Sequence, residues 1–121
     1  MYGMRVVLVE DQTIIALDTE GMLLDLGAAS VHSFTTGDAA IAWLGTTAID
    51  VGVLDVGLGT TTSFPVAEFL TQLGVPFIFT TGYGDSKMFP APLLGVPIVR
   101  KPYVIEALGE ALAQCLRSRG A

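Results

Sequence analysis

Four apolar runs in this 121-residue chain each end at residues suited to phosphate or metal chemistry. The runs cover residues 5–9, 51–55, 76–80 and 96–100. At or directly after their ends stand Glu10-Asp11, Asp55, Thr81 and Lys101-Pro102. If the runs are parallel strands, these residues meet at the carboxyl edge of one sheet, where open α/β sheets bind ligands. The pattern therefore predicts a polar site made by four separate segments.

The segments between the runs predict helices and one further strand. Residues 29–34 alternate weakly and suggest an edge strand, and 57–63 reads as a loop of small residues. Helices are expected at 12–26, 36–44, 65–73 and 103–119. In the first of these, Ile14, Leu17, Gly21 and Leu24 recur at helical spacing. The prolines of 85–97 leave a fourth helix there short, irregular or absent. Strand and helix alternate without a linker, so we expect a single doubly wound α/β domain over 1–121.

Composition excludes several classes of protein. With 51% hydrophobic and 15% charged residues, the chain is too apolar to be disordered. Its net charge of -6 argues against nucleic-acid binding. The longest stretch without a charge, 69–84, is too short and too broken to span a membrane. Cys115 is the only cysteine and His32 the only histidine, so neither a disulfide nor a His/Cys zinc site is expected. We expect a cytoplasmic protein in which Cys115 is a buried thiol.

The residue types at the predicted site suit phosphoryl transfer. Asp55 can accept a phosphoryl group as an aspartyl phosphate. Glu10, Asp11 and Asp55 would repel one another, and Mg²⁺, which prefers oxygen ligands, would relieve that repulsion. The Thr81 hydroxyl and the Lys101 ammonium would then bind the new phosphoryl oxygens.

Over essentially its whole length the chain resembles the CheY-like receiver domain of two-component response regulators. The residues that carry this resemblance are Glu10-Asp11, Asp55, Thr81 and Lys101-Pro102. The resemblance implies Mg²⁺ carboxylates, a phosphoacceptor, a switch hydroxyl and a phosphate-pairing lysine at those positions. It also implies that the Gly57 carbonyl completes the metal site and that the Lys101–Pro102 peptide is cis. The implied fold is the flavodoxin-like five-stranded parallel sheet of order 2-1-3-4-5.

The stretch 76–84 further resembles the FAT GUY subclass of receivers, which are often stand-alone proteins or modules attached to sensor kinases. The resemblance implies that a sensor histidine kinase or a phosphotransfer protein donates the phosphoryl group. It also implies a partner-binding switch in a phosphorelay, catalysing only its own phosphorylation and dephosphorylation. A stand-alone receiver is the first expectation, and a module from a hybrid sensor kinase is the alternative. Whether the chain forms a homodimer stays open.

Two positions depart from the usual receiver pattern. Ile98 stands where most receivers carry an aromatic switch residue, so Tyr83 or Tyr103 is expected to replace it, beside Pro102 and Thr81. Gly57 stands where many receivers orient the hydrolytic water, and the bulky Tyr83 would shield the phosphoryl group. Slow autodephosphorylation is therefore expected. Phosphorylation is further expected to order the proline-rich 85–97 segment.

Other functions fit the sequence less well. A haloacid-dehalogenase-type phosphatase needs a second aspartate two residues after Asp55, where this chain has Gly57. A flavodoxin-like cofactor site needs a phosphate-binding loop after the first strand, but Glu10, Asp11 and Gln12 would repel phosphate. A receiver-like interaction module that never takes phosphate remains a third alternative.

Overall fold

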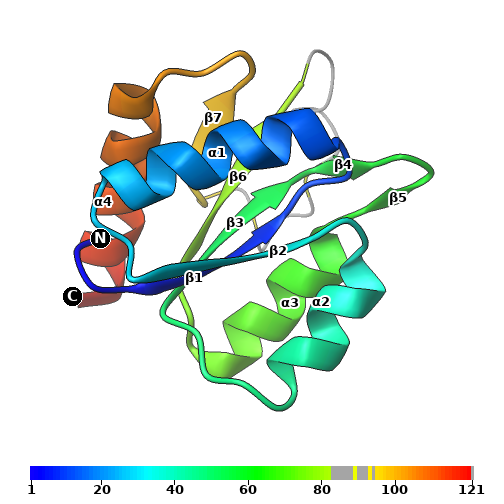
Figure 1. Cartoon of the computed structure of the whole chain (residues 1–121). Helices are drawn as coiled ribbons and strands as arrows, with labels where there is room; N and C mark the ends of the chain where they lie inside the picture. The colour runs from blue at the N-terminus through cyan, green and yellow to red at the C-terminus, as the bar shows by residue number, and fades with distance from the viewer. Residues whose placement is uncertain (83–88, 90–92, 94, 121) are drawn as a thin grey trace.

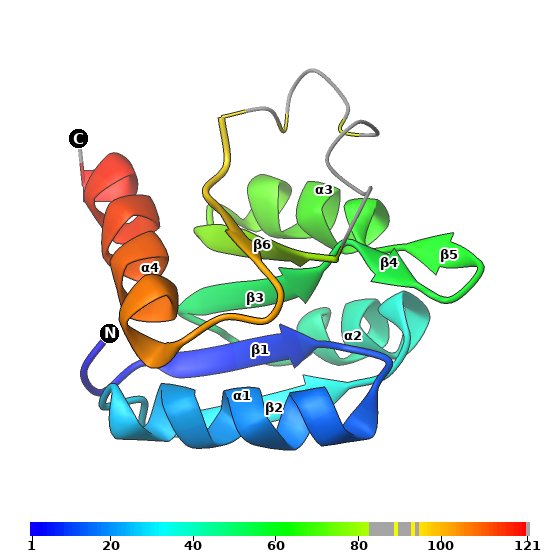
Figure 2. The same cartoon turned by 90° about the horizontal axis from the view of Figure 1, so that it is seen from above.

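Five parallel strands form the centre of the molecule in the computed structural model, which describes residues 1–82, 89, 93 and 95–120. They are β1 (Arg5–Val9), β2 (Ser30–Phe34), β3 (Val51–Asp55), β6 (Phe77–Thr81) and β7 (Ile98–Arg100). Their spatial order is β2-β1-β3-β6-β7, and each neighbouring pair is parallel (Figure 2). Counted in chain order, this is the predicted 2-1-3-4-5 arrangement, so the fold class is confirmed.

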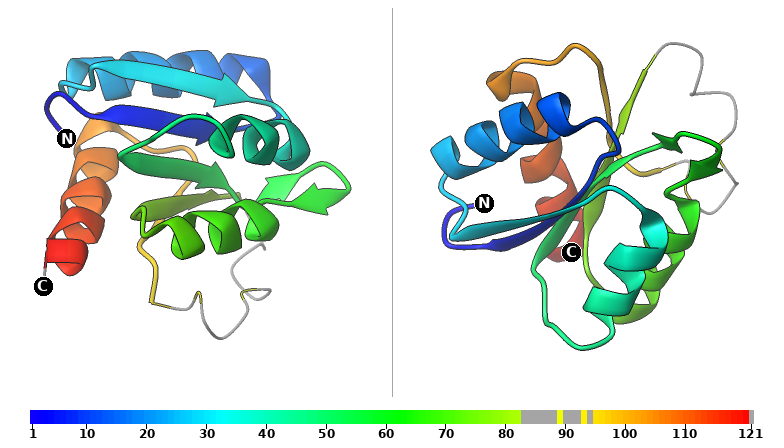
Figure 3. Two further views of the ribbon diagram at one scale, coloured as in Figure 1. Left: turned by 90° about the horizontal axis from the view of Figure 1, so that it is seen from below. Right: turned by 45° about the vertical axis from the view of Figure 1, so that its right-hand side comes forward.

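In the described part of the chain, four helices cover the two faces of the sheet. They are α1 (Thr13–Asp25), α2 (Gly37–Leu44), α3 (Phe64–Leu73) and α4 (Ile105–Gly120). Helices α1 and α4 lie on one face, and α2 and α3 lie on the other (Figures 1 and 3). None of the helices in the described residues is long and apolar enough to cross a membrane.

Strand β1 illustrates how the sequence builds two cores at once. Val7 and Val9 belong to the core cluster beneath α2 and α3, whereas Val6 and Leu8 belong to the cluster beneath α1 and α4. Successive side chains of a strand point to opposite faces, so a strand buried on both faces must be apolar throughout. This buried position brings the chain that follows β1 to the middle of the carboxyl edge.

Local signals set the ends of α2 and α3, which lie within one residue of the bounds predicted for these helices. The Thr36 hydroxyl accepts a 3.2 Å hydrogen bond from the Ala39 N–H and caps α2. Pro65 lies in the first turn of α3, and Gly74 ends that helix in the left-handed conformation at φ 72°. Strand β6 begins at Phe77 rather than at Pro76, which has no N–H to contribute to a ladder.

The face of α1 that packs on the sheet is not the stripe that predicted the helix. Ile14, Leu17 and Leu24 are 83%, 62% and 51% exposed. The buried residues of α1 are Ala16, Thr19 and Leu23. These also recur at helical spacing, so apolar periodicity alone could not select between the two stripes. The helix itself was predicted correctly, and its exposed apolar stripe is a finding of the structure.

The expected loop at 57–63 contains a small antiparallel hairpin. Strands β4 (Gly57–Leu58) and β5 (Thr61–Thr62) pair across a turn in which Gly59 has φ 72°. A positive φ is readily adopted only by glycine, and β-branched threonines favour the returning strand. The prediction of an irregular loop was therefore wrong in detail. The hairpin extends beyond the main sheet next to the carboxyl edge (Figure 1).

Two further expectations concern the second half of the chain. Most of the proline-rich 85–97 segment, and Tyr83, lie outside the described residues. Cys115 is buried as predicted, and its thiol donates to the Leu112 carbonyl. Burial raises the pKa of this thiol to about 11, so it stays protonated at neutral pH.

Candidate functional site

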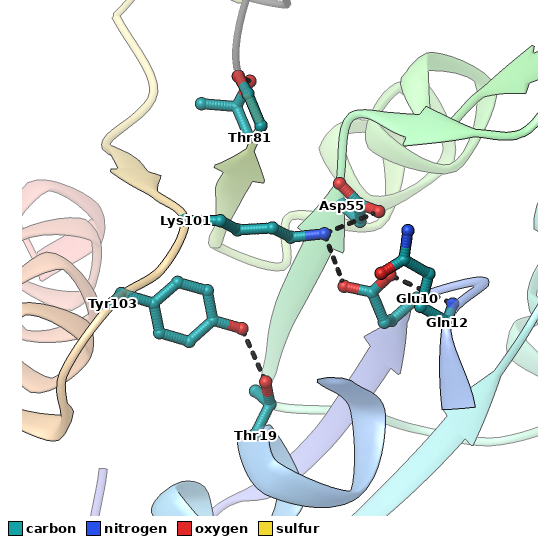
Figure 4. A network of polar contacts seen from close by, with 8 residues as sticks. Glu10, Gln12, Thr19, Asp55, Thr81, Lys101 and Tyr103 are labelled. Atoms are coloured by element: carbon teal, nitrogen blue, oxygen red, sulfur yellow. Dashed lines mark hydrogen bonds and ion pairs between the residues drawn. The ribbon is translucent and has the colours of Figure 1, made fainter. Parts of the chain in front are cut away.

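The carboxyl edge of the sheet brings together the acidic and basic residues that the sequence placed there. Glu10 follows β1, Asp55 is the last residue of β3, and Lys101 follows β7. Figure 4 shows the Lys101 side chain reaching across the edge toward both carboxylates. The three side chains come from positions far apart in sequence, so their meeting is a product of the parallel fold.

Lys101 pairs with both carboxylates at once. Its Nζ atom lies 2.8 Å from Glu10 Oε1 and 3.0 Å from Asp55 Oδ2. Glu10 is 2% and Asp55 is 4% exposed, so these carboxylates are removed from water almost completely. Buried charges need such partners, because an unpaired one costs several kcal/mol. Two carboxylates share one ammonium, which leaves the cluster with an excess of negative charge.

The pKa of Asp55 reflects its burial first and this excess of negative charge second. Burial, followed by the neighbouring Glu10, raises it from 3.8 to about 7, while Lys101 acts in the opposite direction. For Lys101, burial acts to lower the pKa, but its bonds to Glu10 and Asp55 outweigh that effect and raise it. Lys101 therefore stays charged at neutral pH, whereas Asp55 is only partly ionised unless a further cation is bound.

Glu10, Asp11 and Asp55 form a set of possible metal ligands. One carboxylate oxygen from each lies within 4.8 Å of the others. The backbone N–H of Gln12 donates to Glu10 Oε2 at 3.2 Å and helps to orient that carboxylate. Hard oxygen donors suit Mg²⁺, and the two nearly buried carboxylates of Glu10 and Asp55 share the single ammonium of Lys101. The residues present therefore fit a divalent cation.

A cavity of about 330 Å³ opens beside the carboxylates. Its walls include Asp11, Asp55, Gly57 and Lys101, together with Gly59 at the turn of the hairpin. The predicted Gly57 is thus on the wall of the site. Gly59 was not predicted, since its place depends on the hairpin fold of a segment expected to be a loop.

Thr81 reaches the same edge but does not point its hydroxyl at the carboxylates. Its side chain is fully buried at the end of β6, and Thr81 Oγ1 donates to the Gly82 carbonyl at 3.1 Å. The Thr81 carbonyl accepts a 2.8 Å bond from the Lys101 N–H. Thr81 is therefore tied through its backbone to the lysine, while its hydroxyl is directed to its own neighbour (Figure 4).

The Lys101–Pro102 peptide is cis, as the resemblance implied. Tyr103 follows directly, and its hydroxyl is hydrogen-bonded to the hydroxyl of Thr19 on α1. Sequence reasoning missed Thr19. The available signal was a polar residue three positions after Ala16 and four before Leu23, on what proved to be the buried face of a helix.

Solved structures provide the comparison with known proteins. SdrG from Sphingomonas melonis Fr1 is 33% identical, with 94% of this chain and 97% of that chain covered at a TM-score of 0.83. A response regulator receiver protein from Sinorhizobium medicae WSM419 is 27% identical, with 97% of each chain covered at a TM-score of 0.82.

More distant structures share the fold. The receiver domain of the PhyR response regulator from Erythrobacter litoralis is 21% identical, with 97% of this chain and 92% of that chain covered at a TM-score of 0.79. No protein-family model matches the sequence, and no curated protein matches it either. The similarity of this chain to known proteins therefore rests on its matches to solved structures.

Proposed function

We propose that this chain, which is similar in sequence and fold to a response regulator receiver protein, is itself a receiver domain that accepts a phosphoryl group on Asp55 and thereby switches its binding to a partner. The donor would be a sensor histidine kinase or a phosphotransfer protein. The observation that carries the proposal is the buried Asp55 carboxylate, 3.0 Å from Lys101 and within the same oxygen cluster as Glu10 and Asp11.

The proposed transfer needs an ionised Asp55. A carboxylate oxygen of Asp55 would form a bond to phosphorus as the bond from phosphorus to the donor's imidazole nitrogen breaks, and that nitrogen would keep the bonding electrons. The product is an acyl phosphate on Asp55, with the imidazole then free to take up a proton. With the pKa of Asp55 at about 7, any group that favours its ionised form also favours this attack.

Lys101 is proposed to have one role before phosphoryl transfer and another after it. Before transfer, its ammonium lowers the pKa of Asp55 and so favours the nucleophilic form. After transfer, the same ammonium would hydrogen-bond a phosphoryl oxygen, which needs only a small movement because Nζ already lies 3.0 Å from the carboxylate. The Thr81 hydroxyl would leave the Gly82 carbonyl to bind another phosphoryl oxygen. That exchange of partners is the proposed switch, together with the Pro102–Tyr103 loop.

Glu10, Asp11 and Asp55, with the Gly57 carbonyl, are proposed to hold Mg²⁺. When bound, the ion would neutralise excess negative charge between the carboxylates and the phosphoryl oxygens. In this proposal the chain is not an enzyme for a separate substrate. A receiver module from a hybrid sensor kinase, and a receiver-like module that takes no phosphate, remain the alternatives.

Incubation with Mg²⁺ and a small acyl phosphate, followed by intact-mass measurement, tests the proposal. We expect the wild type to gain one phosphoryl group and Asp55→Asn to gain none. Asp50→Asn is the matched control, since Asp50 is a carboxylate at the opposite end of β3, bonded to Arg5. It should be phosphorylated like the wild type.

A second measurement distinguishes a protein that does not react with this donor from a protein that cannot bind a phosphoryl group at all. Beryllium fluoride with Mg²⁺ mimics a phosphoryl group without needing a donor. If the wild type shows neither a phosphoryl adduct nor a beryllium fluoride complex by NMR, the phosphoacceptor function is rejected in favour of the phosphate-independent module.

A further inference from the structure

One polar contact beside the site lies outside the carboxylate cluster. The hydroxyls of Thr19 and Tyr103 are 2.5 Å apart, and they join α1 to the loop that follows β7 (Figure 4). Thr19 is only 1% exposed, and the Tyr103 ring packs against the core cluster beneath α1 and α4. Buried hydroxyls without a partner are costly, so this contact satisfies the buried hydroxyl of Thr19.

The contact holds the chain next to Lys101. Tyr103 is two residues after Lys101, and the backbone N–H of Lys101 is held from the other side by the Thr81 carbonyl at 2.8 Å. The loop is therefore fixed to the sheet before the lysine and to α1 after it. A cavity of about 330 Å³ lies beside this contact, with Asp18, Thr19, Lys101 and Tyr103 on its walls.

We propose that the Tyr103 hydroxyl, through Thr19, is a positioning group that holds Lys101 over Glu10 and Asp55. The proposal rests on the proposed function for its consequence in phosphorylation, but not for its effect on the lysine. Lysine has a long, flexible side chain and loses considerable rotamer freedom when its ammonium is fixed. Fixing its backbone on both sides reduces the number of loop conformations in which Nζ leaves the carboxylates.

The protonation state of Tyr103 suits this hydrogen bond throughout the physiological pH range. Burial raises the pKa of its phenol, while the bond to Thr19 acts in the opposite direction. The phenol therefore remains a neutral hydroxyl through the physiological range and can donate or accept. Within the part of the chain that the structure describes, no hydrogen bond joins Tyr103 to Asp55, and in this proposal the effect of Tyr103 on chemistry passes through Lys101.

The reactivity of Lys101 with an amine-acylating reagent tests the inference without any phosphorylation. Lys87, the only other lysine, provides an internal reference in the same sample after cleavage at acidic residues and peptide mass analysis. Loss of one hydrogen bond corresponds to roughly a 2- to 10-fold change in an equilibrium. We expect Tyr103→Phe and Thr19→Val each to raise the acylation rate of Lys101 by about that factor.

The matched substitutions at Thr19 separate hydrogen bonding from packing. Thr19→Val keeps the shape and removes the hydroxyl, whereas Thr19→Ser keeps the hydroxyl and removes a methyl group. Lys101 should stay protected in Thr19→Ser and become reactive in Thr19→Val. The inference is overturned if Lys101 is as protected in Tyr103→Phe as in the wild type, or if Ser exposes it and Val does not.

Phosphorylation rates provide the second test. Tyr103→Phe should slow phosphorylation by an acyl phosphate in the wild-type background, and should have no further effect in a Lys101→Ala background. An equal slowing in both backgrounds would show that Tyr103 does not act through Lys101 and would overturn the inference. If no variant is phosphorylated, the proposed function fails, whereas the acylation result still decides the role of Tyr103.

Discussion

Lys101 Nζ lies 2.8 Å from Glu10 Oε1, closer than its 3.0 Å contact with Asp55. The ammonium of Lys101 therefore pairs with the carboxylate of Glu10, which is also a candidate metal ligand. Lysine and a divalent cation would compete for the negative charge of Glu10. This competition gives the site two ways to neutralise the same carboxylates.

Lys101→Ala is expected to strengthen Mg²⁺ binding while weakening phosphorylation. Removing a positive charge a few ångströms from the ligands should raise the Mg²⁺ affinity by roughly 3- to 10-fold. Isothermal titration calorimetry measures this affinity. The matched control is Arg100→Ala, which removes an exposed cation one residue earlier and should leave binding unchanged. Unchanged or weaker Mg²⁺ binding in Lys101→Ala would contradict the competition.

Asp55 should make the stability of the metal-free protein depend on pH. Its folded-state pKa of about 7 lies above the value of 3.8 expected when unfolded, so folding favours the protonated form. The stabilisation is complete below pH 3.8 and is lost as the pH rises through about 7. Asp55→Asn lacks this loss, so its stability relative to the wild type should increase between those pH values.

The size of this difference should be on the order of a few kcal/mol, because raising a pKa by one corresponds to about 1.4 kcal/mol. Chemical denaturation in the presence of a chelator, at several pH values, measures it. Mg²⁺ should reduce the difference, because a bound cation would stabilise the ionised carboxylate of the wild type. A difference that is constant with pH would indicate that the pKa of Asp55 is not raised.

Two adjacent leucines of α1 offer a direct test of which face packs. Leu23 is fully buried, whereas Leu24 is 51% exposed. Leu23→Ala should lower the free energy of unfolding by about 2–5 kcal/mol, because it leaves a cavity in the core. Leu24→Ala, the same chemical change one residue later, should cost less than about 1 kcal/mol. Equal losses in urea denaturation would mean that α1 is rotated from the described position.

Gly52 in the middle of β3 is expected to resist substitution. A Cβ atom there would lie 2.8 Å from Leu70 Cδ1 of α3 and 3.2 Å from Phe77 Cβ of β6. Gly52→Ala should therefore destabilise the protein by roughly 1–3 kcal/mol through overpacking. Gly21→Ala is the control, since no atom lies within 4 Å of its Cβ position on α1. It should be neutral or stabilising by up to about 1 kcal/mol, as measured by thermal unfolding.

Much of this fold could be predicted because its signals are local. The run Arg5–Val9 is a strand with the predicted bounds, and so is Val51–Asp55. Apolar, β-branched runs between helical segments indicate buried parallel strands, and parallel strands must end at one edge. The convergence of Glu10, Asp55 and Lys101 follows from that geometry.

Other features depended on contacts that no local pattern encodes. The sequence determined the order of elements and the residue types at the carboxyl edge, since both follow from periodicity along the chain. Tertiary structure alone decided that Thr19 and not Leu17 faces the sheet, and that Lys101 pairs with Glu10 as well as Asp55. Thr19 and Tyr103 are 84 positions apart in the chain. Their pairing exists only once α1 and the loop after β7 pack on the same face, because hydrogen bonds act over a few ångströms.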